Sequence, residues 1–368
     1  MDFTPTEAQD DLGRLTRSIV EKLVTPERQR ELDAAADRFD EPLWRALADA
    51  GVLAAALPES VGGGGFGIPE QCTVLRELGR QVAAVPYLSS IVLAADTIAT
   101  YGTAEQQDWA RRAATGEVVL TVALAEEHND DPTRPTTNAE PDGDGWLLTG
   151  AKITVPVATL ASLILVPAAT ADGTAVFLVD PAADGVTVSR QQVVDRSAEA
   201  YVEFTGVRVG AGDVLIGNDI VDRLVTRAEV GLSALQLGTL DRALELVSEY
   251  ARERVQFDRP IGTFQAVGQR LADAYIDVKG ARLALWQAAW SLDEGLPSAA
   301  AAHTAKFWAC DAGHRVAHTV IHVHGGVGLD TDHPVHRYFL AAKHNEFTLG
   351  SATDHLRKLG ASLAAVPV

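Results

Sequence analysis

The spacing of apolar residues divides the chain into three stretches with different predicted structures. Up to about residue 118, apolar side chains recur every three or four positions, which is typical of amphipathic helices. The residues expected on one face of the first helix are Leu12, Leu15, Ile19 and Leu23. Asp40, Pro42 and Gly51 supply an N-cap, a first-turn proline and a C-terminal glycine for a later helix.

Between about 119 and 215 the apolar residues form short runs separated by turn sequences such as PDGDGW and ATADGT. The predicted strands are Val118–Ala125, Trp146–Thr149, Leu163–Pro167, Ala175–Asp180, Val186–Ser189 and Tyr201–Val209. Six short strands without an intervening helix indicate a small barrel or sandwich. The acidic segment from Glu126 to Asp144 is interpreted as a solvated loop.

From about residue 218 the helical period returns over long segments, which predicts a helical bundle. The two expected stripes are Leu235, Leu240, Leu244 and Val247, and then Leu271, Ala274, Val278, Leu283 and Trp286. A third helix is expected from about Ala299 to His322. The order of helices, strands and helices along one chain narrows the choice of fold.

Net charge excludes some classes of partner. The chain has 368 residues, 31 Lys and Arg against 50 Asp and Glu, and a formal charge of −19. A strongly acidic protein is a poor ligand for nucleic acid or for an anionic membrane surface. No uncharged apolar run is long enough to span a bilayer, and the opening MDFTPTEAQDD has no signal-peptide pattern.

Cysteine and histidine usage predicts neither a disulfide framework nor a metal site. Cys72 and Cys310 are far apart in sequence, and we interpret them as buried thiols in a reducing cytoplasm. His314, His318 and His322 follow each other at intervals of four, but no HExxH pattern accompanies them. The expected localisation is therefore cytoplasmic, and no metal is predicted.

The most informative segment runs from Tyr250 to Asp273, with the sequence YARERVQFDRPIGTFQAVGQRLAD. Together with DFTPTEAQ, LPESVGGGGFG, GWLLTGAKITV and HGGVGLDTDHPVHRYFLAAK, in that order, it resembles the acyl-CoA dehydrogenase family. Several dispersed matches in the correct order are more specific than one motif. The resemblance implies an α+β multidomain fold: an N-terminal helical domain (1–118), a middle β-barrel domain (119–215) and a C-terminal four-helix bundle (216–368).

The resemblance also implies FAD, held at a subunit interface of a homo- or heterotetramer. Arg254 suits a pyrophosphate oxygen, since guanidinium matches phosphate geometry. The alternative for Arg254 is an exposed ion pair of little energetic value. The further cofactor-binding candidates are Gln256, Phe264, Gln265, His322, His324, Gly325, Gly326 and Thr154.

Two of these candidates have an ordinary structural alternative or an imperfect match. Gly325 and Gly326 permit close approach of an adenosine diphosphate moiety, but they equally suit the end of a helix. Thr154 stands where the family places a strand that contacts the flavin, although the local sequence departs from the family pattern. Residues 251–282 contain six basic and four acidic residues, so this segment is locally basic within an acidic chain.

The expected position of the catalytic base is where the chain departs most from the family pattern. Removing the α-proton of a thioester requires a carboxylate, while a hydride passes from the β-carbon to the flavin. The usual base position falls on Leu349 in the segment KHNEFTLGSATDH, and leucine cannot abstract a proton. Some branches place the base on the first helix of the bundle, near Glu229, and Glu346 lies one turn before the usual position. For each glutamate the alternative is an ordinary helix-surface residue.

The TLGSAT sequence resembles an actinobacterial branch that is linked to the breakdown of steroid or other bulky acyl-CoA thioesters. Some members of that branch pair two different subunits, only one of which carries the base. The chain is therefore either a complete FAD-dependent acyl-CoA dehydrogenase using Glu229 or Glu346, with an electron-transfer flavoprotein as acceptor, or a base-deficient subunit of a heterotetramer. A third interpretation is a flavin oxidase of the same fold.

Overall fold

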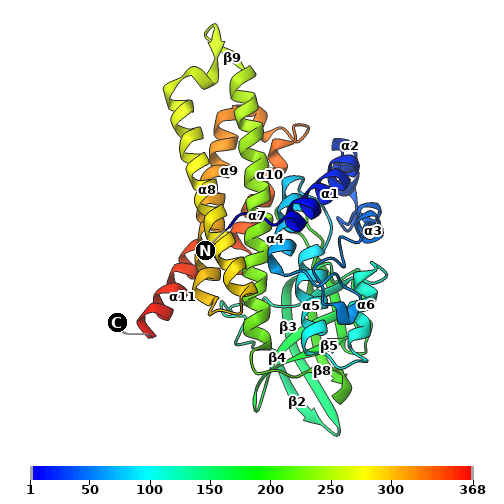
Figure 1. Ribbon diagram of the computed structural model, residues 1–368. Helices are drawn as coiled ribbons and strands as arrows, with labels where there is room; N and C mark the ends of the chain where they lie inside the picture. The colour runs from blue at the N-terminus through cyan, green and yellow to red at the C-terminus, as the bar shows by residue number, and fades with distance from the viewer. Residues whose placement is uncertain (1–2, 366–368) are drawn as a thin grey trace. The chain divides into compact units, whose positions relative to one another are not determined.

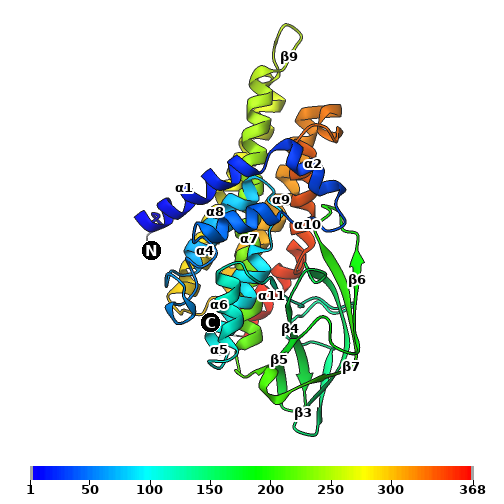
Figure 2. The same cartoon turned by 90° about the vertical axis from the view of Figure 1, so that its right-hand side faces the viewer.

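The computed structural model describes residues 3–365, so the outermost residues of the first and last predicted domains lie outside it. The chain forms two compact units (Figures 1 and 2). The first contains the chain up to Pro26, then Cys72–Ala83, and the chain from Glu229 onward. The second contains Glu27–Gln71 and Ala84–Ala228. Each unit is described by itself.

The first unit is built from long helices, and α9 packs against α8, α10 and α11 (Figure 1). The helices are α1 (Glu7–Leu23), most of α4 (Ile68–Arg80), α7 (Ile220–Glu253) from Glu229 on, α8 (Gln265–Asp293), α9 (Ala299–His324), α10 (Val335–Phe347) and α11 (Ala352–Ala365). The short strands β9 (Val255–Gln256) and β10 (Arg259–Pro260) and the turns η4 (Ile261–Thr263) and η5 (Gly325–Leu329) complete it.

Two glycines bring α4 and α7 into backbone contact. A Cβ atom on Gly238 would lie 1.9 Å from the carbonyl oxygen of Arg76, and one on Gly79 would lie 2.1 Å from that of Leu235. Both positions therefore require a residue without a side chain, because the atoms that a Cβ would meet belong to the backbone. This crossing fixes α4 against the bundle.

A buried amide links three helices of the bundle. Gln236 of α7 donates from Nε2 to the carbonyl oxygens of Ala309 and Ala342, at 3.2 Å each. Its Oε1 accepts from Asn345 at 2.9 Å. A Cβ on Gly313 would lie 2.1 Å from Gln236 Nε2, so the glycine makes room for the amide. Each hydrogen-bonding group of this buried side chain has a partner, as stability requires.

The second unit combines short helices with an eight-stranded mixed sheet. Its helices are α2 (Pro26–Ala34), α3 (Glu41–Asp49), η1 (Glu59–Val61), the π-helix η2 (Tyr87–Ala95), α5 (Asp96–Tyr101), α6 (Gln107–Ala114) and η3 (Ala211–Asp213). The strands are β1 (Leu120–Val122), β2 (Asn138–Asp142), β3 (Gly145–Pro156), β4 (Leu163–Thr170), β5 (Gly173–Val179), β6 (Val186–Gln191), β7 (Glu199–Val209) and β8 (Val214–Leu215).

The sheet order is β6-β7-β3-β2-β4-β5-β8, and β1 pairs with β4 in parallel. Most other neighbours are antiparallel, and β3 and β7 form the longest pairing, with register shifts at two places. Leu148, Phe177 and Phe204 lie in the core of the sheet domain and are at most 1% exposed.

The fold class predicted from the sequence is confirmed: helical N- and C-terminal parts frame a mixed-sheet middle. All six predicted strands are present, and Asp40 caps α3 by accepting from the Leu43 amide. The interpretation of residues 126–144 as a solvated loop is wrong in part, because β2 lies within it and pairs with β3. The polar sequence of β2 does not predict a strand, because its position is set by backbone pairing with β3.

The face predicted for the first helix is also wrong in part. Leu12 is buried, but Leu15 is 42% exposed, and Thr16 and Val20 are the residues buried next to it. A Cβ on Gly13 would lie 3.0 Å from Thr73, so close packing on α4 selects the face that carries the small residues. Among residues 3–365, no helix has both the length and the apolarity needed to cross a bilayer.

Candidate functional site

Four of the nine cofactor-binding candidates lie in or beside the β9–β10 hairpin at the end of the α7–α8 pair (Figure 1): Arg254, Gln256, Phe264 and Gln265. Gln256 pairs with Arg259, and Phe257 and Asp258 form the turn with φ of +53° and +64°. Positive φ at both positions is the conformation of a type I′ hairpin turn, which favours Asn and Gly. Phe257 adopts it and is 86% exposed.

Arg254 and Gln256 are exposed, and the Arg254 guanidinium has no ion pair or hydrogen bond within residues 3–365. Gln256 Nε2 bonds only the adjacent Val255 carbonyl, at 2.8 Å. Arg259 lies 4.2 Å above the Phe264 ring, and Gln265 begins α8 with its side chain exposed. The uncommitted Arg254 guanidinium and the exposed Gln256 amide fit an anionic ligand such as a pyrophosphate.

Gly325 and Gly326 lie at the end of α9. Gly325 has φ of +62° and its N–H bonds the carbonyls of Ile321 and His322, so it terminates the helix. No atom lies within 4 Å of a Cβ built on either glycine. The backbone at this helix end is therefore open to close approach of a ligand. The geometry is compatible both with a cofactor contact and with a helix terminator at these glycines.

The two histidines beside these glycines differ. His322 is exposed. His324 is only 4% exposed, stacks on Tyr250 at a centroid distance of 4.3 Å and donates from Nδ1 to the Val320 carbonyl at 2.8 Å. Burial lowers the pKa of His324. His324 therefore packs inside the end of the bundle, whereas His322 faces outward.

Thr154 belongs to the second unit. It lies where the β3–β7 register shifts between Lys152 and Val155, and its φ is +48°. Bulges of this kind redirect a side chain, and positive φ is uncommon for a β-branched residue. Its N–H donates to Gln191 Oε1 at 2.7 Å, so that amide already has a partner.

Glu126, which the sequence places at the start of a solvated loop, forms a buried ion pair that no local pattern predicted. Its Oε1 lies 2.7 Å from Lys152 Nζ, and it also accepts from Thr137 N–H at 2.9 Å. Burial alone would raise the pKa of Glu126, but Lys152 and these hydrogen bonds hold it far below the usual carboxyl range. The signal was a lysine within the otherwise apolar strand sequence GAKITV.

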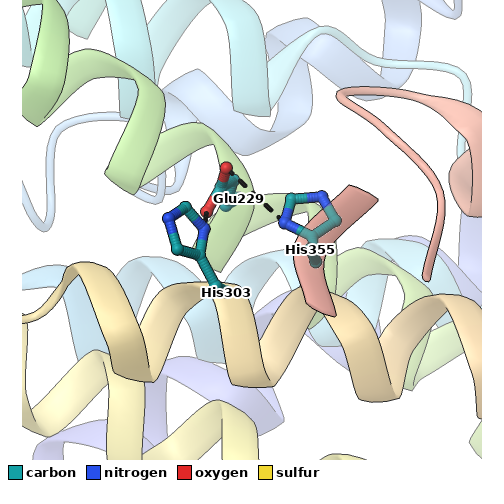
Figure 3. A group of neighbouring side chains, drawn as sticks. All are labelled: Glu229, His303 and His355. Carbon is teal, nitrogen blue, oxygen red and sulfur yellow. Dashed lines mark hydrogen bonds and ion pairs between the residues drawn. The ribbon is translucent and has the colours of Figure 1, made fainter. Parts of the chain in front are cut away.

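Glu229, the first base candidate, is 1% exposed and held among cationic or titratable groups (Figure 3). His303 Nδ1 lies 2.8 Å from its Oε2. Lys358 Nζ and His355 Nδ1 lie 3.7 Å and 3.8 Å from its Oε1. Burial lowers the pKa of His355 to about 4. The carboxylate is therefore enclosed rather than open to a substrate within this unit.

Glu346, the second candidate, is also engaged. Its oxygens lie 2.6 Å from Lys343 Nζ and 3.2 Å from His314 Nδ1. It is 9% exposed and lies on α10, one turn before Leu349. Neither glutamate is an unpaired carboxylate.

Leu349 lies in the α10–α11 loop with φ of +61°. His355 Nε2 donates to its carbonyl at 3.0 Å. Below the loop, the fully buried Lys306 donates to the carbonyls of Asn345 and Gly350, at 3.2 Å and 3.1 Å, and lies 2.8 Å from Cys310 Sγ. No local sequence pattern predicts a role for His303, His355 or Lys306, because each is brought to this loop only by the packing of separate helices.

The family is shown by two domain models. The acyl-CoA dehydrogenase N-terminal domain matches residues 6–117, and the acyl-CoA dehydrogenase C-terminal domain matches residues 216–364. The chain belongs to the acyl-CoA dehydrogenase family, whose members are FAD-dependent oxidoreductases that act on CH–CH bonds.

Individual relatives cover the full length of the chain. The acyl-CoA dehydrogenase FadE27 of Mycobacterium tuberculosis is 52% identical over 376 residues, covering 100% of both chains. A chain in the crystal structure of the ChsE4-ChsE5 complex from Mycobacterium tuberculosis matches with a TM-score of 0.97 and 52% identity, covering 100% of both. A variant of the Tcur3481-Tcur3483 steroid ACAD matches with a TM-score of 0.94 and 41% identity, covering 98% of both.

Proposed function

We propose that this chain is one subunit of an FAD-dependent acyl-CoA dehydrogenase that desaturates the α,β bond of a bulky, steroid-type acyl-CoA thioester. In this proposal the chain contributes FAD-binding residues, and a second, related subunit supplies the catalytic base. The observation that carries the proposal concerns the three positions at which a catalytic base was expected. Residue 349 is leucine, and Glu229 and Glu346 are both paired and enclosed. A general base must reach the proton that it removes.

The exposed hairpin supports a shared cofactor site. Arg254 and Gln256 offer donors to phosphate oxygens at the exposed β9–β10 hairpin, and Phe264 offers a ring face where α8 begins. The backbone at Gly325 and Gly326 and the exposed His322 would be further contacts, as would Gln265 and, in the second unit, Thr154. When bound, FAD supplies the acceptor for the hydride that leaves the β-carbon. Phe257, 86% exposed on the same hairpin, is a side chain expected to be covered in an assembly.

The comparisons support a heteromeric assembly and a steroid-type substrate, because two of the most similar structures are a ChsE4-ChsE5 complex and a Tcur3481-Tcur3483 steroid ACAD. The proposal further takes the assembly to be a heterotetramer that passes its electrons to an electron-transfer flavoprotein and acts in the cytoplasm. The division of the chain into domains 1–118, 119–215 and 216–368 stays a prediction.

The second candidate is a complete enzyme in which Glu229 is the base. The observation that favours it is the position of His355, whose two nitrogens lie 3.0 Å from the Leu349 carbonyl and 3.8 Å from Glu229 Oε1. Glu229 is therefore adjacent to the loop that carries the base in most of the family. A flavin oxidase is the third candidate and would differ in reacting rapidly with oxygen.

The test compares the chain alone with the chain co-expressed with its partner subunit. Under anaerobic conditions, a steroid-type acyl-CoA should bleach the flavin absorbance of the complex. The same addition should not change the absorbance spectrum of the isolated chain. Glu229→Gln and Glu346→Gln in this chain should leave turnover by the complex within about threefold of wild type, since neither is the base. Turnover by the isolated chain that Glu229→Gln abolishes would establish the second candidate instead.

A further inference from the structure

A buried cluster of Glu229, His303 and His355 joins three helices of the first unit (Figure 3). Glu229 comes from α7, His303 from α9 and His355 from α11. One ligand atom from each residue lies within 4.8 Å of the others. The side chains of Glu229 and His355 are 1% and 0% exposed, and that of His303 is 16% exposed. Both imidazoles point toward the carboxylate.

Two buried atoms at the centre of the cluster lack a hydrogen-bond partner among the described residues: Glu229 Oε1 and His355 Nδ1. They lie 3.8 Å apart. His355 donates from Nε2 to the Leu349 carbonyl, so in the neutral ring Nδ1 presents a lone pair. A carboxylate oxygen is also an acceptor. Two acceptors that face each other in a buried site are costly unless a cation lies between them.

We propose that this cluster binds a zinc ion through Glu229, His303 Nδ1 and His355 Nδ1, and that the ion cross-links α7, α9 and α11. Two imidazoles and one carboxylate form an established three-ligand zinc set, with a fourth position left for water. This site goes beyond the proposed function, which leaves these three residues without a role in catalysis.

The distances require only small adjustments. Zinc bonds of about 2.0–2.2 Å place tetrahedral ligands about 3.3 Å apart. The contacts of 2.8 Å from His303 to Oε2 and 3.8 Å from His355 to Oε1 lie on either side of that value. For these two contacts, shifts of about half an ångström, within the range of side-chain torsions, suffice. The two imidazole nitrogens lie within 4.8 Å of each other, so the rings must also close toward the ion.

Lys358 is the competing cation. Its Nζ lies 3.7 Å from Glu229 Oε1, beyond hydrogen-bond distance. Its side chain is 24% exposed on a flexible stem, so the ammonium group has a path to solvent when a metal binds. The fully buried Lys306 is already committed to Cys310 and to backbone carbonyls.

The test measures metal retention by the full, untagged chain, alone and in complex with its partner. The protein is stripped with a chelator, equilibrated with a zinc salt, desalted and analysed by elemental mass spectrometry. About one zinc per chain is expected. Glu229→Gln, His303→Gln and His355→Gln should each lower retained zinc by more than about tenfold. His318→Gln, at an exposed histidine on the same α9 helix, is the matched control and should retain zinc.

X-ray absorption of the zinc-loaded wild type is the second measurement, and it does not depend on folding of the variants. It should report two imidazole ligands and one carboxylate. The thermal midpoint of the wild type should rise with free zinc, and that of His355→Gln should not. Failure of the wild type to retain zinc, or equal retention by the three ligand variants, overturns the proposal. Activity enters neither readout, so the result is independent of the proposed function.

Discussion

At the scale of single residues, the environment of a side chain decides its chemistry. Glu126, Glu229 and Glu346 are all buried glutamates, and each has a different partner, namely Lys152, His303 and Lys343. In contrast, Arg254 is exposed and unpaired within residues 3–365 in a chain of charge −19. An arginine that stays uncommitted in an acidic protein is well suited to an anionic ligand.

Replacing Arg254 is expected to weaken FAD binding. A charge-assisted hydrogen bond contributes about 1.5–3 kcal/mol, so Arg254→Gln should raise the dissociation constant of FAD for the complex by about tenfold or more. Flavin fluorescence titration of the complex measures this. Arg270→Gln, at another exposed arginine of the same basic segment, should change it by less than about threefold. Equal effects of Arg254→Gln and Arg270→Gln on the dissociation constant would contradict a specific contact of Arg254 with FAD and indicate a general electrostatic effect.

Removing Lys152 is expected to destabilise the sheet domain. It would leave the Glu126 charge buried without its partner, which typically costs about 3–5 kcal/mol. Lys152→Met should therefore lower the free energy of unfolding measured in urea. The double variant Lys152→Met with Glu126→Gln should recover much of the loss, because no buried charge remains. A double variant no more stable than the single one would contradict this.

The same ion pair predicts a dependence of stability on pH. The pKa of Glu126 is depressed in the folded state, so its contribution is fully present above the ordinary carboxyl range, near pH 4.5. It is lost as the pH falls below that range, because the unfolded chain then binds a proton that the folded chain does not. Urea denaturation of wild type and Glu126→Gln between pH 3 and 7 measures this, and the wild type should show the steeper loss.

At the scale of elements, small residues set how closely helices pack. The α4–α7 crossing depends on Gly79 and Gly238, because backbone atoms occupy the space that a Cβ would need. The sequence contains both glycines, but glycine within a long helix ordinarily lowers the stability of that helix. Only the crossing gives these two a positive role.

Gly238→Ala is expected to destabilise the helical unit by more than about 2 kcal/mol, because its Cβ would lie 1.9 Å from the Arg76 carbonyl oxygen. Gly360→Ala, on α11 with no atom within 4 Å of a Cβ, is the matched control. That change should be neutral or stabilising by about 0.5–1 kcal/mol, since alanine is the better helix former. Thermal or urea unfolding of the two variants distinguishes them, and equal effects would exclude a packing role.

At the scale of the whole molecule, the surface shows where an assembly is expected. Tyr275, Ile276 and Leu283 on α8 are 55%, 63% and 60% exposed. Exposed large apolar side chains that gather along one element mark interaction surfaces. They lie on the helix that follows the β9–β10 hairpin, which fits the proposal that an FAD site is shared between subunits.

Leu283→Glu is therefore expected to weaken assembly with the partner subunit without unfolding the chain. A charge in an apolar interface costs several kcal/mol unless it is paired. Size-exclusion chromatography of the co-expressed subunits should show dissociation. Ile216→Glu, at a residue that is 83% exposed in the other unit, is the control and should leave the assembly intact. If both Leu283→Glu and Ile216→Glu caused dissociation, or neither did, the prediction that α8 forms the interface would be wrong.

The sequence by itself determined the order of the elements and the family. Periodicities of 3.6 and 2 residues depend only on residues close in the sequence. The helical stretches, six of the eight sheet strands and the cap at Asp40 could therefore be predicted. The candidate FAD contacts Arg254, Gln256 and Phe264 could also be proposed from the sequence, because they are close together in it and the family motif keeps their spacing. Leu349 in place of a carboxylate was visible for the same reason.

Only the tertiary structure decided which distant residues meet. The β2 strand is defined by pairing with β3 rather than by its own pattern, and the Glu126–Lys152 pair joins residues 26 positions apart. His303 and His355 reach Glu229 from separate helices, whereas the evenly spaced His314, His318 and His322 form no metal-binding group within residues 3–365. Contacts of this kind depend on the packing of whole helices, which local sequence patterns do not encode.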